Sequence, residues 1–360
     1  MKKTKQFSTL SIAAAFIGTI VGAGFATGQE VLQFFSFYGM KGFIGIVVSA
    51  ILFSYFGILI MFISKERHAD SHLELVRFTF GKRLGVVMDW FITISFLGVL
   101  VVMAAGSGAV AEEQLGLPPF IGSIAVILLS FLTVSTGVKN VIRVIGLVVP
   151  FLLCAVIGVA LFSLMTDPLT ASKIALLESI EAPSQTSWPF SAILYVSYNI
   201  ILAVAILSPL GVEANSRKNL LLGGILGGLG LGIGILAIDL AVISGVPEIL
   251  PFQVPMVYLA SKFSPLFALV FGLILILEIY TTAVSILYGF AARMAYGNRQ
   301  RILWAGLASL AAVIAAQYGF SKIISTVYPL MGFFGFVFLG GLLWTHLKDH
   351  LSGVFHIQKK

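Results

Sequence analysis

The sequence has 360 residues, of which 59% are hydrophobic and only 10% are charged. A soluble domain covers its surface with about 25% charged residues, so this composition excludes the soluble globular class and predicts a polytopic membrane protein. The single cysteine, Cys154, excludes a disulfide framework and a thiolate metal site.

Ten segments are apolar and long enough to cross a bilayer, which needs about 20 residues per helix. Each must be helical, because hydrocarbon offers no partner to an unpaired backbone group. The predicted spans are 8–37, 42–64, 84–111, 118–136, 140–165, 188–210, 219–245, 265–292, 300–317 and 322–346.

The basic residues predict the orientation of these spans. With the N-terminus inside, only four of the 22 Lys and Arg residues fall in outer segments, namely Lys41, Lys173, Lys262 and Lys322. Cytoplasmic loops carry the excess of basic residues in membrane proteins, so both termini are expected in the cytoplasm. The protein is expected in the cell (plasma) membrane. The net charge of +7 then follows from topology, and a nucleic-acid-binding surface is not expected.

The spans divide into two groups of five, around a connecting segment at 166–187 that is expected to be extracellular. An odd number of spans per group places the groups in opposite orientations, and the longest loop follows the second span in each. This pattern is typical of transporters built from inverted repeats. The expected organisation is a first repeat over 1–165, the loop 166–187, and a second repeat over 188–360 with a short cytoplasmic tail.

The first span contains an unusual stretch, "GTIVGAGFATGQE", from Gly18 to Glu30. In inverted-repeat transporters the first helix of each repeat is broken at the solute site, and glycines allow such a break. Helix packing is the alternative, because Gly18 and Gly22 have small-xxx-small spacing. The repeat pattern favours a broken helix, with Glu30 outward of the break as an outer-gate residue, a proton site or a solvated vestibule carboxylate.

The same symmetry predicts a second break, in the sixth span. Ser197, Tyr198 and Asn199 lie in its centre, and Asn199 needs a polar partner in hydrocarbon. The zone from Ser197 to Ala203 is favoured over Pro209, which kinks the cytoplasmic end.

The eighth span carries a polar stripe of Glu278, Thr281, Thr282 and Ser285, spaced as one face of a helix. Intramembrane carboxylates are costly and usually mark an ion path, and oxygen ligands of this type suit an alkali cation. The alternative is a buried Glu278 that neighbouring helices satisfy. No phosphate-binding loop, paired-histidine metal motif or catalytic triad is present, so no enzyme is expected.

The residues resemble a known superfamily. The stretch "IGTIVGAGFATGQEVLQFFSFYG" is similar to the first helix of the amino acid–polyamine–organocation (APC) superfamily, which has the leucine-transporter (LeuT) fold. "FGKRLGVVMDW" (80–90) and "VEANSRKNLLLGGILGG" (212–228) are similar to segments around its third and sixth helices. Over nearly its full length the chain resembles the YkvI-type bacterial membrane proteins. The resemblance implies an all-α membrane protein of ten helices in a 5+5 inverted repeat, with helices 1 and 6 discontinuous.

The resemblance also implies roles for individual residues. A solute would bind at the first break and at the sixth helix, and sodium would bind between the first and eighth helices. Glu278 departs from the small residue common in relatives, and this departure adds to sodium alone the alternative that a proton replaces or accompanies it. The implied solute-binding residues are Gly22, Ala23, Gly24, Phe25, Ala26, Tyr198 and Asn199; the candidate sodium ligands are Gly18, Val21, Glu278, Thr281 and Thr282; and the coupling or gating residues are Glu30 and Glu278.

Together these features predict a symporter of a small organic solute, an amino acid or a related zwitterion, driven by sodium or protons. Its expected partners are that solute, the ion and the lipid bilayer, with no cofactor beyond a sodium ion. A cationic amine or quaternary ammonium solute is an alternative, since aromatic residues and a carboxylate bind cations. A non-transporting solute sensor on the same fold is another; Thr281 and Thr282, as cation ligands, favour transport over it.

Overall fold

The computed structural model describes residues 7–69, 72–136, 141–182, 186–295 and 297–351. In these ranges the chain is helical, apart from connecting turns and one isolated bridge between Phe7 and Ala214. The elements in chain order are α1 (Thr9–Ile20), α2 (Ala23–Thr27), α3 (Gln29–Phe34), the short 3-10 helix η1 (Ser36–Tyr38), α4 (Met40–Arg67), α5 (His72–Leu115), α6 (Pro119–Thr136), α7 (Val141–Thr166), α8 (Ala171–Ser179), α9 (Trp188–Glu213), α10 (Arg217–Ser244), α11 (Pro255–Phe263), α12 (Pro265–Met294), α13 (Asn298–Ala316) and α14 (Phe320–Leu351).

The first predicted span is interrupted, as expected from its glycines. Val21 and Gly22 have extended backbone dihedrals between α1 and α2, and Gly28 has φ of 80° between α2 and α3. A positive φ favours glycine, so Gly28 allows the chain to turn there. The Thr27 side chain supports this turn, because its hydroxyl donates to the Gly24 carbonyl at 2.7 Å and accepts from the Gln29 amide at 3.3 Å.

The predicted break in the sixth span is wrong. This span is α9, a single helix through the whole zone from Ser197 to Ala203, with Pro209 inside it. The polar side chains of the zone bond to their own helix: Ser197 donates to the Ile193 carbonyl at 2.6 Å, and Asn199 donates to the Tyr195 carbonyl at 3.0 Å. No glycine precedes Gly211 in α9, so nothing in this zone favours leaving the helical conformation.

The helices confirm a multi-pass membrane protein. Six described helices are long and apolar enough to cross a membrane, namely α4, α5, α9, α10, α12 and α14. The C-terminal part of α7 (Phe151–Thr166) and the following α8 form a further apolar pair, bent by 115°, and α1 and α6 are shorter apolar helices. The segment 166–187 was expected as a loop, and it contains the helix α8. The count of ten spans in a 5+5 repeat stays a prediction.

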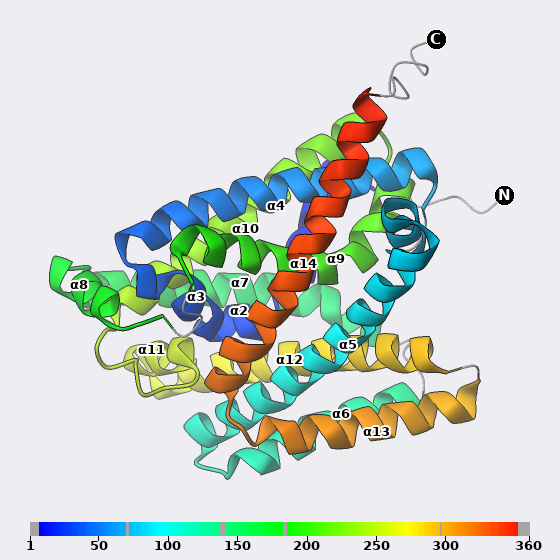
Figure 1. The fold of residues 1–360 in the computed structure, drawn as a ribbon. Helices are drawn as coiled ribbons and strands as arrows, with labels where there is room; N and C mark the ends of the chain where they lie inside the picture. The colour runs from blue at the N-terminus through cyan, green and yellow to red at the C-terminus, as the bar shows by residue number, and fades with distance from the viewer. Residues whose placement is uncertain (1–6, 70–71, 137–140, 183–185, 296, 352–360) are drawn as a thin grey trace.

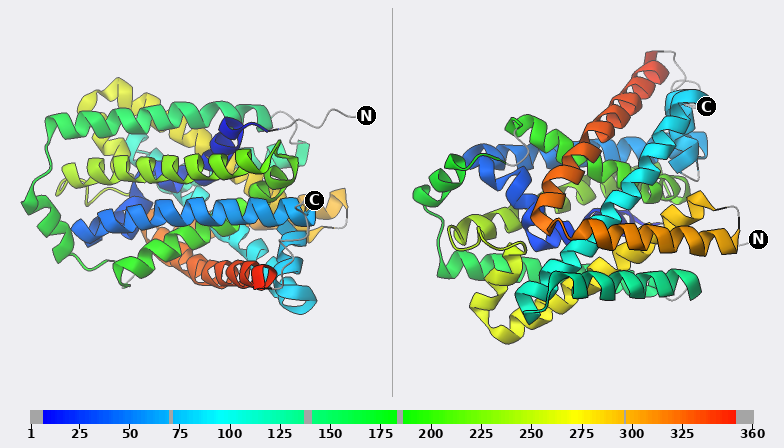
Figure 2. Two further views of the ribbon diagram at one scale, coloured as in Figure 1. Left: turned by 90° about the horizontal axis from the view of Figure 1, so that it is seen from above. Right: turned by 60° about the horizontal axis from the view of Figure 1, so that its bottom comes forward.

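The broken span lies in the interior of the helix bundle. The continuous helix α9 packs between α4 and α14 and also contacts α1, while α10 packs on α1 and α4 (Figure 1). Around this centre α4, α10 and α7 run side by side, and α6 lies beside α13 on another face (Figure 2). Phe16 and Phe25, on either side of the interruption, are both fully buried.

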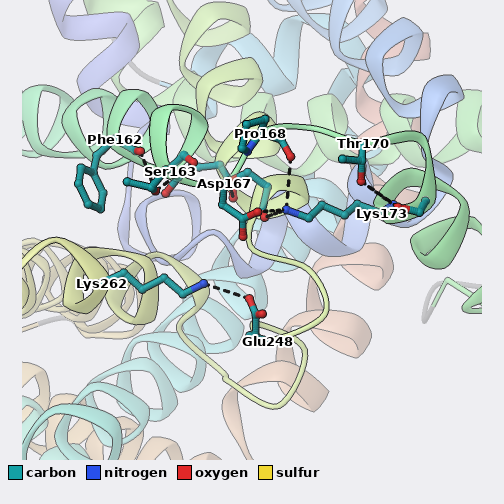
Figure 3. A network of polar contacts seen from close by, with 12 residues as sticks. Phe162, Ser163, Asp167, Pro168, Thr170, Lys173, Glu248 and Lys262 are labelled. Atoms are coloured by element: carbon teal, nitrogen blue, oxygen red, sulfur yellow. Dashed lines mark hydrogen bonds and ion pairs between the residues drawn. The ribbon is translucent and has the colours of Figure 1, made fainter.

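Polar contacts join the chain at the two ends of the bundle. At one end Lys65 of α4 donates to the Ala214 carbonyl at 2.7 Å, beside the start of α1. At the other end Lys173 pairs with Asp167 and donates to the Ser244 carbonyl at 2.6 Å, which ties α8 to the end of α10. Figure 3 shows this second end, where Lys262 of α11 also pairs with Glu248 at 3.0 Å.

Candidate functional site

The interruption of the first span positions a carboxyl group against a glycine. Because the chain turns at Gly28, the Glu30 side chain folds back over α2. A Cβ atom placed on Gly24 would lie 1.6 Å from Oε1 of Glu30, far inside van der Waals contact. The Glu30 carboxyl can occupy this position only because residue 24 is glycine. Glu30 is buried, with 5% of its surface exposed.

Two tyrosine side chains lie against this carboxyl. Tyr198 of α9 donates to Oε2 of Glu30 at 2.6 Å, and the Tyr328 side chain of α14 lies close enough to interact with the same carboxyl group. The two phenol rings are stacked, with centroids 4.5 Å apart and planes inclined by 9°. The broken span, α9 and α14 therefore meet at Glu30.

An aromatic cluster surrounds the two tyrosines. Tyr195 packs edge-on against Tyr198 at 5.5 Å and against Phe35 at 4.9 Å, and Phe34 lies 5.8 Å from Tyr198. The Tyr195 hydroxyl is buried and has no hydrogen-bond partner in the described part of the chain. The Glu30 carboxyl thus has an environment of tyrosine hydroxyls and aromatic rings.

The predicted solute-binding residues divide into two groups. Gly24 and Tyr198 meet at Glu30, and Gly22 forms the extended step next to them. Phe25 points toward α10, where its ring fills the space beside Gly234, and Asn199 bonds back to its own helix. The structure therefore does not bring Phe25 and Asn199 to Glu30. Ala26 is buried within α2, and Ala23 is its first residue.

The predicted cation ligands lie on two elements. Gly18 is in the last turn of α1 and Val21 is the first residue beyond it, while α12, with Glu278, packs against the adjoining α2. Thr281 is buried and its hydroxyl donates to the Glu278 carbonyl at 3.1 Å, whereas Thr282 is half-buried. Oε2 of Glu278 is buried without a hydrogen-bond partner in the described residues.

Tyr328 is a site residue that the sequence reasoning missed. It lies in α14 immediately before Pro329, within an apolar segment, and no neighbouring residue marks it. No sequence signal could have found it; only the structure shows that Tyr328 is 3% exposed, and a buried tyrosine hydroxyl usually has a partner.

No family model matches the chain. The chain is 34% identical over 343 residues to the uncharacterized membrane protein YkvI of Bacillus subtilis (strain 168), covering 93% of this chain and 95% of that protein. It is also 27% identical over 329 residues to the uncharacterized protein YyaD of the same strain, covering 91% and 94%.

Solved structures with a similar fold are transport proteins of the LeuT fold. MhsT in complex with L-phenylalanine is similar with a TM-score of 0.65 and 16% identity, covering 92% of this chain and 89% of that one. A Na⁺-coupled sialic acid symporter gives 0.58 and 14%, covering 91% and 77%. The Eremococcus coleocola manganese transporter gives 0.60 and 15%, covering 91% and 76%. At these identities the likeness shows the fold.

Proposed function

Because this chain belongs to the family of the membrane protein YkvI, and because its fold is that of LeuT-fold transporters, we propose that it is a secondary active transporter of a small organic solute. The observation that carries the proposal is the interruption at Val21 and Gly22, in the buried interior of a membrane protein. Non-helical backbone at membrane depth is tolerated where it is buried in protein or lines a cavity, and in this fold it forms the solute site. We propose no catalytic activity.

The proposed solute is an amino acid or a related zwitterion. It would bind between the interrupted backbone near Gly22 and Gly24 and the aromatic side chains of α9, with Tyr198 and Glu30 at the boundary of the site. The similarity to MhsT, which is solved with L-phenylalanine, supports this class. The tyrosines next to Glu30 are buried and closely packed, so the proposed site would have to open for a solute to enter.

The proposed driving ion is sodium, with the proton as the alternative. The last carbonyl groups of a helix have no intrahelical partner, so the end of α1 offers the oxygens of Gly18 and Val21 to a cation. The hydroxyls of Thr281 and Thr282 would complete the site from α12. A Na⁺-coupled symporter among the structures with this fold supports sodium. The buried carboxyl groups of Glu30 and Glu278 are the residues that would carry a proton.

A second substrate class has a specific observation in its favour. The Glu30 carboxyl lies among the rings of Tyr198, Tyr328 and Tyr195, and a carboxylate with aromatic faces is the environment that binds ammonium groups. A cationic amine or quaternary ammonium solute would bind Glu30 directly in place of the tyrosine hydroxyls.

The proposal includes a membrane topology. Ten spans form two inverted repeats, 1–165 and 188–360, joined by 166–187 on the outer face, with both termini in the cytoplasm and the chain in the cell (plasma) membrane. In such a fold alternating access is the movement of one repeat or bundle against the other around the site that the interrupted span forms.

Uptake into proteoliposomes tests the proposal. Purified protein is screened first by thermal shift against amino acids and against quaternary amines, each with sodium and with potassium. Solutes that stabilise the protein are then offered as radiolabelled compounds under a sodium gradient and, separately, a proton gradient. We expect gradient-driven accumulation that Gly24→Leu abolishes, because leucine fills the space at Glu30. Stabilisation without accumulation under either gradient would indicate a solute sensor instead.

A further inference from the structure

The outer half of the first span comprises α3 and η1. A second carboxyl group is buried beside its C-terminal end. Asp239 of α10 has no exposed surface, and it lies against η1. The Ser36 hydroxyl is 2.5 Å from Oδ1 of Asp239, and Oδ2 is buried without a hydrogen-bond partner in the described chain. An ionised carboxylate without a counter-charge is very costly at such a place.

Among the described residues, no charged side chain on the elements around Asp239 bonds to it. Arg217 of α10 pairs with Glu66 at 3.0 Å, and Lys41 and Lys218 lie near the starts of α4 and α10. On α3 the carboxyl of Glu30 bonds to Tyr198, and on η1 the hydroxyl of Tyr38 bonds to Thr186. The described part of α1 contains no titratable side chain, and Cys154 of α7 is exposed. Further bonds on these elements are those of Lys65 of α4 to Ala214, Lys173 of α8 to Asp167 and Ser244, Glu178 of α8 to the Met40 amide, and Lys262 of α11 to Glu248.

The Ser36 hydroxyl has two acceptors within reach. Besides Oδ1 of Asp239, the Val31 carbonyl of α3 lies 3.4 Å from it. A hydroxyl carries one hydrogen, so it donates to one of these acceptors at a time. When Asp239 is ionised, Ser36 donates to it. When Asp239 is protonated, the carboxylic acid donates to Ser36 Oγ, and the Ser36 hydrogen turns toward Val31.

We propose that Asp239 and Ser36 form a proton-binding site, separate from Glu30 and from the candidate cation ligands on α12. The proton binds to one carboxyl oxygen of Asp239, no other covalent bond changes, and only the direction of the Ser36 hydroxyl reverses. A proton needs one oxygen, whereas a metal cation held by hard oxygen ligands takes several. Among the described residues, the side-chain oxygens that the hydrogen bond joins here are the two of the Asp239 carboxyl and one of Ser36.

The position of the site indicates what it controls. Two hydrogen bonds fix the outer half of the first span. At its start Glu30 bonds to Tyr198 of α9, and at its end Ser36 bonds to Asp239 of α10. Proton binding at Asp239 changes the hydrogen bond at the end of this segment and adds one to the Val31 carbonyl, which already accepts from the Phe35 amide at 2.9 Å. The hydrogen bonds that attach the outer half of the first span to α10 would therefore depend on pH. This inference goes beyond the proposed function, since proton binding is measurable without any solute.

Infrared difference spectroscopy of the full chain in lipid, titrated from acid to alkaline pH, tests the site. The C=O stretch of a protonated carboxylic acid reports each buried acid separately. We expect one such band to disappear in Asp239→Asn and to persist in Glu30→Gln, which is the matched control. If Asp239→Asn shows every pH-dependent band of the unmodified protein, the proposal is overturned.

Variants of Ser36 keep the test decisive where Asp239→Asn does not fold. Ser36→Ala removes the hydroxyl, so the Asp239 band should shift in frequency and titrate at a different pH; Ser36→Thr retains the hydroxyl and should restore both. An unchanged band in Ser36→Ala contradicts the proposal. The same titration is run in sodium and in potassium chloride: a band that sodium removes at constant acid pH would identify a sodium site and overturn the proton assignment.

Discussion

Oε1 of Glu30 lies 1.6 Å from the position that a Cβ atom on Gly24 would occupy. Any residue other than glycine at position 24 would therefore collide with the Glu30 carboxyl. The two residues are six positions apart, and the turn at Gly28 brings them together. The same carboxyl accepts a hydrogen bond from Tyr198. Gly24 therefore sets the geometry of a contact that joins the broken span to α9.

The first prediction compares two glycines of the interruption. Gly24→Ala forces the Glu30 carboxyl out of its place, and overpacking of this type costs about 1–3 kcal/mol. Gly22→Ala is the matched control, because its nearest neighbour is 4.0 Å from the new Cβ and its backbone has a negative φ. We expect Gly24→Ala to lower the unfolding temperature in detergent and Gly22→Ala to leave it close to that of the unmodified protein.

A double mutant identifies the cause of that loss. In a Glu30→Ala background the carboxyl is absent, so adding Gly24→Ala should cost much less than it does alone. An equal cost in both backgrounds would mean that Gly24 is required for helix packing and not for the place of Glu30.

The second prediction concerns the hydroxyls around Glu30. Tyr198→Phe removes the donor 2.6 Å from the carboxyl and leaves a buried acceptor short of one partner, which typically costs about 1–3 kcal/mol. Tyr195→Phe removes a hydroxyl that has no partner in the described chain, so it should be neutral or slightly stabilising. The measurement is thermal unfolding of both variants. Equal effects would show that ring packing, rather than the hydrogen bond, holds this region together.

The sequence was sufficient for the interruption of the first span, and the reason is local. Gly22 and Gly28 lie where the chain leaves helical geometry, and their spacing is visible without any tertiary contact. The all-helical membrane class also followed, because a composition with 10% charged residues leaves only a membrane protein; the ten helices and the 5+5 repeat stay predictions. The contact of Glu30 with Gly24 did not follow, since it depends on the direction of a side chain after the turn at Gly28.

The failures have physical causes as well. The break expected in the sixth span came from symmetry, but Ser197 and Asn199 bond to their own helix in α9, which a polar residue in an apolar helix can do. Tyr328 is more than a hundred residues from Tyr198 in the chain, so only the packing of α14 on α9 brings the two rings together. The candidate cation ligands and the repeat boundaries stay predictions.

The third prediction tests the proposed sodium site. Thr282→Val keeps the shape of the side chain and removes an oxygen, so it should weaken sodium binding by about 1–3 kcal/mol, or about 5- to 150-fold. The sodium concentration for half-maximal uptake should rise accordingly. Ser285→Ala, at an exposed position of the same helix, is the control and should leave that concentration unchanged. Equal sodium dependence in both variants would count against Thr282 as a ligand.

The fourth prediction separates proton from sodium coupling at Glu278. Glu278→Gln retains size and polarity but cannot release a proton. If Glu278 carries the coupled proton, uptake driven by a pH gradient should be lost, while exchange of internal for external solute should continue, because exchange needs no net proton release. If sodium alone drives uptake, the variant should still accumulate solute under a sodium gradient. Loss of exchange together with uptake would indicate a folding or solute-binding role.

The last prediction tests the topology with Arg67→Cys and Ser261→Cys, introduced singly into a Cys154→Ser background so that each variant has one cysteine. Both positions are exposed, at the end of α4 and in α11 respectively. Five spans separate them in the proposed architecture, and an odd number places them on opposite sides of the membrane. A membrane-impermeant maleimide should label Ser261→Cys in intact cells, and Arg67→Cys only after permeabilisation. The bend of 115° between α7 and α8 makes this a sharp test, because α8 then lies at the surface and adds no crossing. If α8 crossed separately, the count would become even, and both cysteines would be labelled from the same side.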